Sequence, residues 1–172
     1  PNHPFSWKIL GIIWLEAGKK SEALSANQKA LKLSPNDASI YSNLGLALKD
    51  LGRLPEAESC LRQAIILRYD FVEGHNNLGI ILQELGRLYE AEASLNQAIS
   101  LKPDFAEAHY NLANTLGDLC RLDEAEASYR QAIALQADYA KAHNNLGITL
   151  GKLIRFDEAE ASCRQAIALK SD

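Results

Sequence analysis

The sequence predicts an all-α protein made of five copies of one helix pair. Short sequence motifs recur along the chain at a spacing of 34 residues. Within each copy the apolar residues fall at helical intervals, and glycine or proline stands at the ends of the expected helices. A period of this length is typical of repeat proteins, in which each copy is one supersecondary unit. The copies are expected at residues 4–37, 38–71, 72–105, 106–139 and 140–172, as parts of a single domain over residues 1–172.

Three phrases define the repeat. Asn-Leu-Gly, or Asn-Leu-Ala in the fourth copy, begins at Asn43, Asn77, Asn111 and Asn145. Glu-Ala-Glu begins at Glu56, Glu90, Glu124 and Glu158, and Gln-Ala-Ile begins at Gln63, Gln97, Gln131 and Gln165. The first copy is degraded and keeps only Leu10, Gly11, Ala23 and Ala30.

The second copy shows why each copy should contain two helices. Ile40, Leu44 and Leu48 are spaced like one face of a helix. Gly52 should end that helix, because a residue without Cβ readily adopts a positive φ. Pro55 can open the next helix, where its missing N–H costs little. Neighbouring pairs must then stack, because one pair cannot bury its apolar faces alone.

Some positions depart from this pattern. Cys120 and Ile154 replace the glycine between the two helices of the fourth and fifth copies. Because isoleucine strongly disfavours positive φ, we expect the turn of the fifth copy to be reshaped or strained. Asp70, Asp104 and Asp138 stand just ahead of the following helices, near positions that favour N-caps.

The repeat resembles the tetratricopeptide repeat over nearly the whole chain. The residues that carry the resemblance in the first copy are Trp7, Leu10, Gly11, Trp14, Ala23, Ala30 and Pro35. Asn27 departs from the family pattern, where an aromatic or large apolar residue is usual. The resemblance implies antiparallel helix pairs stacked in a right-handed superhelix. It also implies a concave groove, lined by the first helix of each pair, that holds a peptide or partner segment.

Composition and charge argue against several function classes. The net charge is −4 and no basic cluster occurs, whereas a nucleic-acid-binding protein needs a basic stripe. No apolar run approaches the roughly 18 residues of a membrane span. Cys60, Cys120 and Cys163 form no CxxC pair, which favours free thiols in a reducing, cytoplasmic compartment over a zinc site or disulfides. The chain contains no Met, which predicts a piece of a larger protein.

The asparagines form the candidate peptide-binding site. In the family, the position shared by Asn43, Asn77, Asn111 and Asn145 faces the groove, and Asn76, Asn114 and Asn144 lie nearby. An amide carries both a donor and an acceptor, so a ladder of amides can hold a peptide backbone. Tyr110, Lys49 and Lys141 are expected to add selectivity. In the alternative interpretation the asparagines bond to neighbouring helices and hold the repeats in register, and both roles can coexist.

No catalytic residue, metal site or cofactor is expected. His75, His109 and His143 recur at equivalent positions, so stacking should separate them by roughly 10 Å, too far to share one ion. We therefore expect them to pack. The arginines after each interhelix turn and the glutamates three residues later are expected to form solvated ion pairs. An active site is a single constellation, which a feature repeated in each copy is not.

Three functions follow from these observations. The first is a non-enzymatic module that binds an extended segment of a protein partner. The second rests on a similarity to the arrays of O-GlcNAc transferase-like glycosyltransferases and of bacterial members of the family, and it makes this chain the substrate-recruiting arm of a larger enzyme. The third is self-association through the last copy, where Phe156, Cys163, Ile167 and Leu169 are expected to be partly uncovered. That surface could pair with another copy of the chain or with the native continuation of this one.

Overall fold

A computed structural model describes residues 3–169, and over that range the chain forms ten α-helices and no strand. The helices are α1 (Pro4–Glu16), α2 (Lys20–Leu33), α3 (Ala38–Asp50), α4 (Leu54–Leu67), α5 (Val72–Glu84), α6 (Leu88–Leu101), α7 (Ala106–Asp118), α8 (Leu122–Leu135), α9 (Ala140–Lys152) and α10 (Phe156–Ala168). Each predicted copy contains two of them, so the predicted all-α class and the helix pairs are confirmed.

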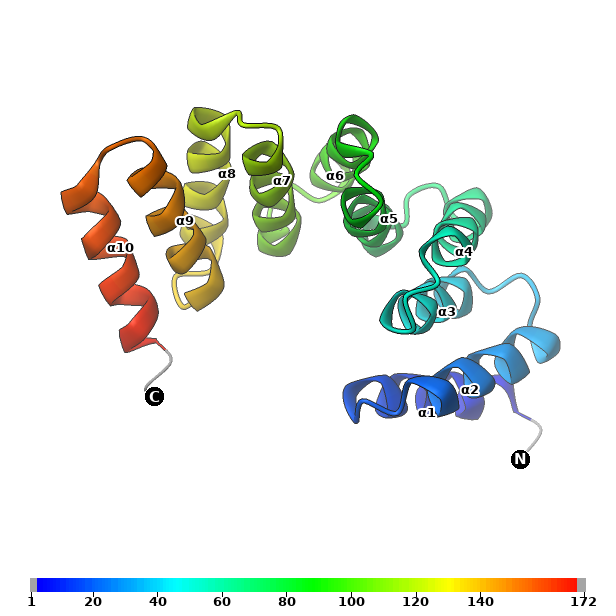
Figure 1. The fold of residues 1–172 in the computed structure, drawn as a ribbon. Helices are drawn as coiled ribbons and strands as arrows, with labels where there is room; N and C mark the ends of the chain where they lie inside the picture. The colour runs from blue at the N-terminus through cyan, green and yellow to red at the C-terminus, as the bar shows by residue number, and fades with distance from the viewer. Residues whose placement is uncertain (1–2, 170–172) are drawn as a thin grey trace. The chain divides into compact units, whose positions relative to one another are not determined.

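The chain forms two compact units, residues 1–86 with α1–α5 and residues 87–172 with α6–α10. Within each unit, helices that follow one another in the sequence pack side by side (Figure 1). The boundary between the units lies between α5 and α6, inside the third predicted copy. One domain over the whole chain remains a prediction, and residues 1–2 and 170–172 at its ends lie outside the described residues.

The turns between paired helices keep one backbone geometry whether or not they contain glycine. Gly52 has a φ of 75°, and the Arg53 N–H donates to the Leu48 carbonyl. Ile154 has a φ of 63°, and the Arg155 N–H donates to the Leu150 carbonyl in the same way. The turn of the fifth copy is therefore not reshaped. Its isoleucine adopts the left-handed conformation, which is unfavourable for a side chain branched at Cβ.

Replacing Ile154 by Gly should therefore raise the free energy of unfolding by about 1–2 kcal/mol, because it removes this strain. Urea titration followed by circular dichroism measures the change. The reciprocal control is Gly52→Ala, where an added Cβ meets no atom within 4 Å but the φ is positive. That control should lower the stability. An Ile154→Gly protein no more stable than the parent would mean that the turn carries no strain.

Aromatic residues, and not the preceding aspartates, stand at the N-caps of three first helices. Helices α5, α7 and α9 are preceded directly by Phe71, Phe105 and Tyr139, and none of these caps makes a side-chain hydrogen bond. The aspartates lie one residue earlier. Phe71 is buried and packs with Ala38 and Ala64, so core packing decides which residue adjoins the helix.

Small residues lie where the helices cross, as the repeat pattern predicts. In the first unit Ala23, Ala57 and Ala64 are fully buried, and in the second Ala125 and Ala132 are. The larger buried residues of the second unit are Leu95, Leu112, Leu116, Tyr129, Leu146 and Leu150. Across residues 3–169, none of the helices combines the length and the apolar character needed to cross a membrane.

Candidate functional site

In the second unit, polar side chains from α7, α8 and α9 form a connected hydrogen-bond network. The Asn145 amide nitrogen donates to the Tyr110 hydroxyl at 3.2 Å and to Asn114 Oδ1 at 3.0 Å. The Tyr129 hydroxyl donates to the same Asn114 oxygen at 2.6 Å. These bonds join the fourth copy to the fifth, as expected if the asparagines hold the repeats in register.

The same network leaves some polar atoms open. Asn144, exposed on α9, donates to Asn145 Oδ1 at 3.2 Å, and its own Oδ1 has no partner among residues 3–169. The Asn114 amide nitrogen also lacks a partner within that range. Lys141 is exposed at the start of the same helix as Asn144. The Asn114 and Asn144 amides therefore each have one polar atom that is hydrogen-bonded within the protein and one that is available to a ligand.

Three tyrosine rings surround this network. The Tyr110 ring centroid lies 6.0 Å from that of Tyr129 and 5.0 Å from that of Tyr139. Burial raises the pKa of Tyr129 to about 12, and burial also raises the pKa of Tyr139 to about 12. The neutral phenols are therefore part of the folded structure, and the Tyr129 proton is held by Asn114.

The raised pKa of Tyr129 predicts a loss of stability at high pH. In the unfolded chain a tyrosine ionises near pH 10.0, whereas folded Tyr129 keeps its proton to about pH 12. The stabilisation should be complete below pH 10 and lost as the pH rises to about 12. Urea titrations across this range should show a smaller loss for Tyr129→Phe than for the parent. Tyr69→Phe, which removes an exposed phenol, is the control, and an equal effect of both variants would contradict the prediction.

The first unit carries a smaller set of the predicted residues. The Asn77 amide nitrogen on α5 donates to the Ser42 hydroxyl on α3 at 3.2 Å. Asn43 is half-buried, and its side chain makes no hydrogen bond within residues 3–169. The Lys49 Nζ atom lies 3.8 Å from Asp50 Oδ1. The pattern of the second unit recurs, since Asn77 is fixed through its nitrogen while its oxygen remains open.

Two of the predicted asparagines are buried. Asn76 is 2% exposed and Asn111 is 7% exposed. The Asn111 carbonyl accepts a hydrogen bond from Thr115 at 3.1 Å. A peptide groove was expected to include both residues, but so little exposed area offers almost nothing to a partner. Asn76 and Asn111 therefore belong to the interior of the helix pairs and not to an exposed binding surface.

The recurring histidines contact the loops that precede their helices. The Nε2 atoms of His75, His109 and His143 donate to the carbonyls of Tyr69, Pro103 and Ala137, at 2.9, 2.9 and 3.0 Å. In the described part of the chain, no three His, Cys, Asp or Glu side chains gather as a metal site requires. The contacts give these histidines a structural role in the third, fourth and fifth copies.

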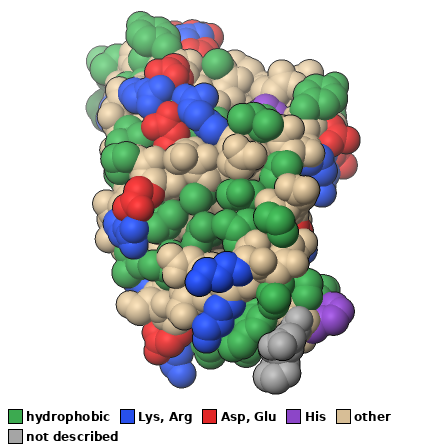
Figure 2. Space-filling model, turned by 90° about the vertical axis from the view of Figure 1, so that its right-hand side faces the viewer, with side chains coloured by type: hydrophobic (Ala, Val, Ile, Leu, Met, Phe, Trp, Pro, Cys, Tyr) green, Lys and Arg blue, Asp and Glu red, His purple; other side chains and the backbone are tan. Residues whose placement is uncertain are grey.

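Arginine and glutamate side chains pair within copies, as expected, and also between copies. Arg121 pairs with Glu124 at 2.5 Å and with Glu92 of the preceding copy at 2.7 Å. Hydrogen bonding to Arg121 lowers the pKa of Glu124. On the face shown in Figure 2, Lys and Arg side chains are scattered, many beside acidic ones, and form no continuous basic patch.

A closed charge square joins the last two copies. Arg155 contacts Glu126 and Glu158, and Arg130 contacts the same two glutamates at 2.8 and 3.0 Å. The contacts between copies were not expected from the sequence, because their partners are 28 and 29 residues apart. Only the way in which one copy stacks on the next brings them together.

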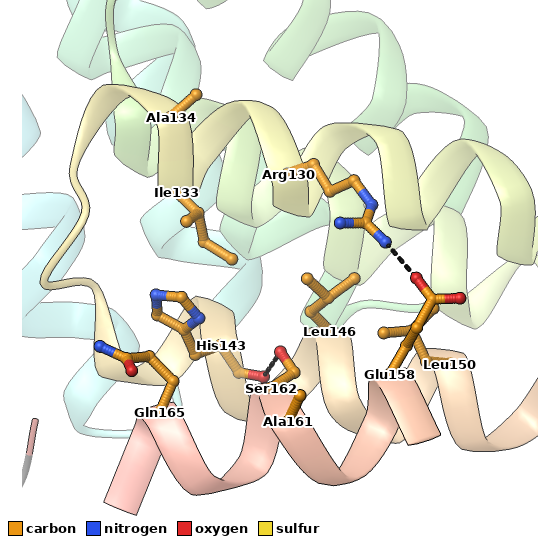
Figure 3. A pocket seen from close by; sticks show the side chains of 10 residues that line it. All are labelled: Arg130, Ile133, Ala134, His143, Leu146, Leu150, Glu158, Ala161, Ser162 and Gln165. Atoms are coloured by element: carbon orange, nitrogen blue, oxygen red, sulfur yellow. Dashed lines mark hydrogen bonds and ion pairs between the residues drawn. The ribbon is translucent and has the colours of Figure 1, made fainter. Parts of the chain in front are cut away.

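The second unit also contains an open hollow of about 430 Å³ between α8, α9 and α10. Ile133, Leu146 and Leu150 give it an apolar lining, and the Arg130–Glu158 ion pair lies at one side (Figure 3). Nothing in the sequence marks this site, because residues of the same kind recur in earlier copies.

Comparison with known proteins places this geometry in a family. A family model described as TPR repeat matches residues 13–52, 81–119 and 121–153. A second, described as Tetratricopeptide repeat, matches residues 38–68 and 140–170. No curated protein matches the chain in sequence.

Solved structures share the fold at low sequence identity. A MamA structure from Desulfovibrio magneticus RS-1 is 20% identical, with a TM-score of 0.81 over 98% of this chain and 95% of that one. PilF of Pseudomonas aeruginosa is 20% identical, with a TM-score of 0.88 over 96% and 75%. YrrB, described as a TPR protein with an unusual peptide-binding site, is 21% identical, with a TM-score of 0.71 over 99% and 88%.

Proposed function

The chain belongs to the tetratricopeptide repeat family, and from that premise we propose that this interaction module binds an extended segment of a partner protein along its first helices. The surface that we propose, called here the amide surface, lies in the second unit and consists of Tyr110, Asn114, Lys141, Asn144 and Asn145. A separate, smaller candidate set in the first unit consists of Asn43, Lys49 and Asn77. Its role is recognition of a protein segment and involves no catalysis.

This proposal rests on amides in which one polar atom is hydrogen-bonded and the other has no partner among the described residues. Asn145 and Tyr129 both donate to Asn114 Oδ1, which leaves the amide nitrogen of Asn114 as a donor for a ligand. Asn144 is fixed through its nitrogen, which leaves its oxygen as an acceptor. Side chains already held in one orientation lose less conformational entropy when they bind a ligand.

A peptide backbone matches this surface chemically. Each residue of an extended peptide offers one N–H and one carbonyl, which are the partners that the Asn144 oxygen and the Asn114 nitrogen require. Lys141 adds a positive charge on the same helix as Asn144 and should favour acidic side chains in the bound segment. YrrB, which shares the fold, is described as having a peptide-binding site.

The proposal is tested by selecting binders from a library of random peptides displayed on phage. Peptides selected on the full chain are then titrated by calorimetry against variants of the two candidate sites. Asn114→Ala and Asn144→Ala should each weaken binding about three- to tenfold, the usual effect of one lost hydrogen bond. The control Gln131→Ala, at an exposed position on α8, should leave the affinity unchanged.

Variants at the hollow separate the two sites. Ile133→Glu places a carboxylate in the apolar lining of the hollow, and none of the proposed amides lines that hollow. Peptides that lose affinity only for Ile133→Glu, and bind the amide variants normally, would assign binding to the hollow and contradict the proposal.

A further inference from the structure

We propose that Tyr110 and Asn114 form a two-donor subsite that takes one backbone carbonyl oxygen of the bound segment, and that the buried Tyr129 is the positioning residue of this subsite. The subsite presupposes the peptide binding proposed above and concentrates its specificity in the fourth copy. Tyr129 is only 4% exposed, so it acts on the ligand through Asn114 and not by contact.

The fourth copy departs from the repeat at the three positions that build this subsite. At the position of Asn114, the other copies have only isoleucine or leucine, at Ile12, Leu46, Ile80 and Ile148. At the position of Tyr129, they have Asn27, Leu61, Leu95 and Cys163. At the position of Tyr110, they have Lys8, Ser42, Asn76 and Asn144. The two tyrosines and the asparagine therefore occur together in one copy and at no equivalent position elsewhere.

The structure joins these three side chains through hydrogen bonds. Asn114 Oδ1 accepts from the Tyr129 hydroxyl at 2.6 Å and from the Asn145 amide nitrogen at 3.0 Å. The same Asn145 nitrogen donates to the Tyr110 hydroxyl at 3.2 Å. The departures from the repeat, which lie on two helices, thus meet in one cluster.

The packing of a helix pair does not require this cluster. In the second copy, Leu46 and Leu61 hold the positions of Asn114 and Tyr129, and Leu61 is fully buried. Leucine packs without hydrogen bonds, whereas a buried polar side chain costs stability unless its hydrogen bonds are made. Positions at which a sequence breaks its own pattern, with no gain in packing, are expected at functional sites. The cluster is therefore better explained by binding than by folding.

The cluster leaves two donors open while its amide oxygens are engaged. The oxygen of Asn114 accepts two hydrogen bonds, and that of Asn145 accepts one from Asn144. The Asn114 nitrogen and the Tyr110 hydroxyl proton have no acceptor within residues 3–169. Because Tyr110 and Asn114 are four residues apart on α7, they lie on one face of that helix. A carbonyl oxygen has two lone pairs and can accept from both donors.

Tyr129 determines which end of the Asn114 amide is offered to the ligand. If this amide turned around, its nitrogen would face the Tyr129 hydroxyl, and the buried phenol proton would lose its acceptor. Leaving a buried donor without a partner is costly, so the hydroxyl keeps the oxygen inward and the nitrogen available. Phenylalanine at this position would keep the ring and remove that constraint.

A calorimetric double-mutant cycle, with the peptides selected on the full chain, tests the positioning role. Tyr129→Phe should weaken binding about two- to tenfold in the parent, the effect of one lost hydrogen bond, and should have no effect in an Asn114→Ala background. Tyr41→Phe, which removes a half-buried hydroxyl in the first unit, is the matched control and should leave the affinity unchanged. An unchanged affinity of Tyr129→Phe, or an equal loss in both backgrounds as a merely structural role would give, would overturn the proposal.

The second donor and the carbonyl are tested separately. Tyr110→Phe keeps the ring and removes the donor, so it should weaken binding by a similar factor, and this variant decides the case if circular dichroism shows Tyr129→Phe to be unfolded. Peptide analogues in which one carbonyl oxygen is replaced by sulfur, a weaker acceptor, identify the bound carbonyl. One analogue should lose affinity for the parent and lose less for Asn114→Ala. No loss with Tyr110→Phe, or the same loss of each analogue with both proteins, would overturn the subsite.

Failure of the subsite differs from failure of the peptide surface. Peptides that bind Asn114→Ala and Asn144→Ala as tightly as the parent would contradict the proposed surface itself. Peptides that are weakened by those two substitutions, but are indifferent to Tyr129→Phe and Tyr110→Phe, would leave the surface in place and overturn only the two-donor subsite.

Discussion

Gly147→Ala should lower the free energy of unfolding by about 1–3 kcal/mol, the usual cost of overpacking a helix crossing. The added Cβ would overlap Cys163 Sγ and lie 3.1 Å from the Ala159 carbonyl oxygen. Because the second obstacle is the backbone of α10, a rotamer change at Cys163 cannot relieve it, and α9 and α10 must separate. Urea titration followed by circular dichroism measures the loss.

Gly151→Ala is the matched control for this prediction. Gly151 lies one turn further along α9, and an added Cβ there meets no atom within 4 Å. Because alanine has a higher helix propensity than glycine, this change should leave the free energy of unfolding unchanged or raise it by up to about 1 kcal/mol. Equal effects of the two substitutions would show that α9 and α10 are not in close contact at Gly147.

Asn27→Leu should raise the free energy of unfolding by roughly 1–3 kcal/mol, the cost of a buried polar atom without a partner. Asn27 is fully buried in α2, and its Oδ1 has no hydrogen-bond partner in the part of the chain that the structure describes. Its nitrogen donates only to the Ala23 carbonyl, one helical turn away. Leucine has a similar branched shape, and Leu61 occupies the same repeat position in α4.

The reciprocal substitution Leu61→Asn serves as the control. It places an amide at a fully buried position and should lower the stability by at least about 2 kcal/mol. Both variants are compared with the parent by urea titration. A loss of stability in Asn27→Leu would show that the hydrogen bond to Ala23 outweighs the unpaired oxygen.

The fold could be predicted from the sequence because the residue pattern of each helix and each turn recurs in several copies. Any one copy departs from the pattern somewhere, as Asn27 does in the first and Ile154 in the fifth. The remaining copies still define the helices and the turns. Even at Ile154 the turn keeps the geometry that glycine gives elsewhere, so the packing of α9 against α10 outweighs the preference of one residue.

The candidate site was only partly predictable. The 34-residue period predicts where the asparagines recur. It also suggests their two roles, which are holding the repeats in register and binding a peptide. Which amides are buried cannot be predicted, because Asn77 and Asn111 occupy the same repeat position, yet Asn77 is half-buried and Asn111 is only 7% exposed. The contact between Arg121 and Glu92 was missed for a related reason, since it depends on how two copies stack.

The central claim, that the open amide atoms bind a peptide backbone, is tested most directly by a calorimetric cycle. A selected peptide and its backbone N-methylated analogues are each titrated against the parent chain and Asn144→Ala. Because the open Asn144 oxygen can only accept, one methylated N–H should abolish the difference between the two proteins. We expect a loss of about three- to tenfold with the parent peptide and none with that analogue. The same loss with every analogue, or no loss with the parent peptide, would contradict the claim.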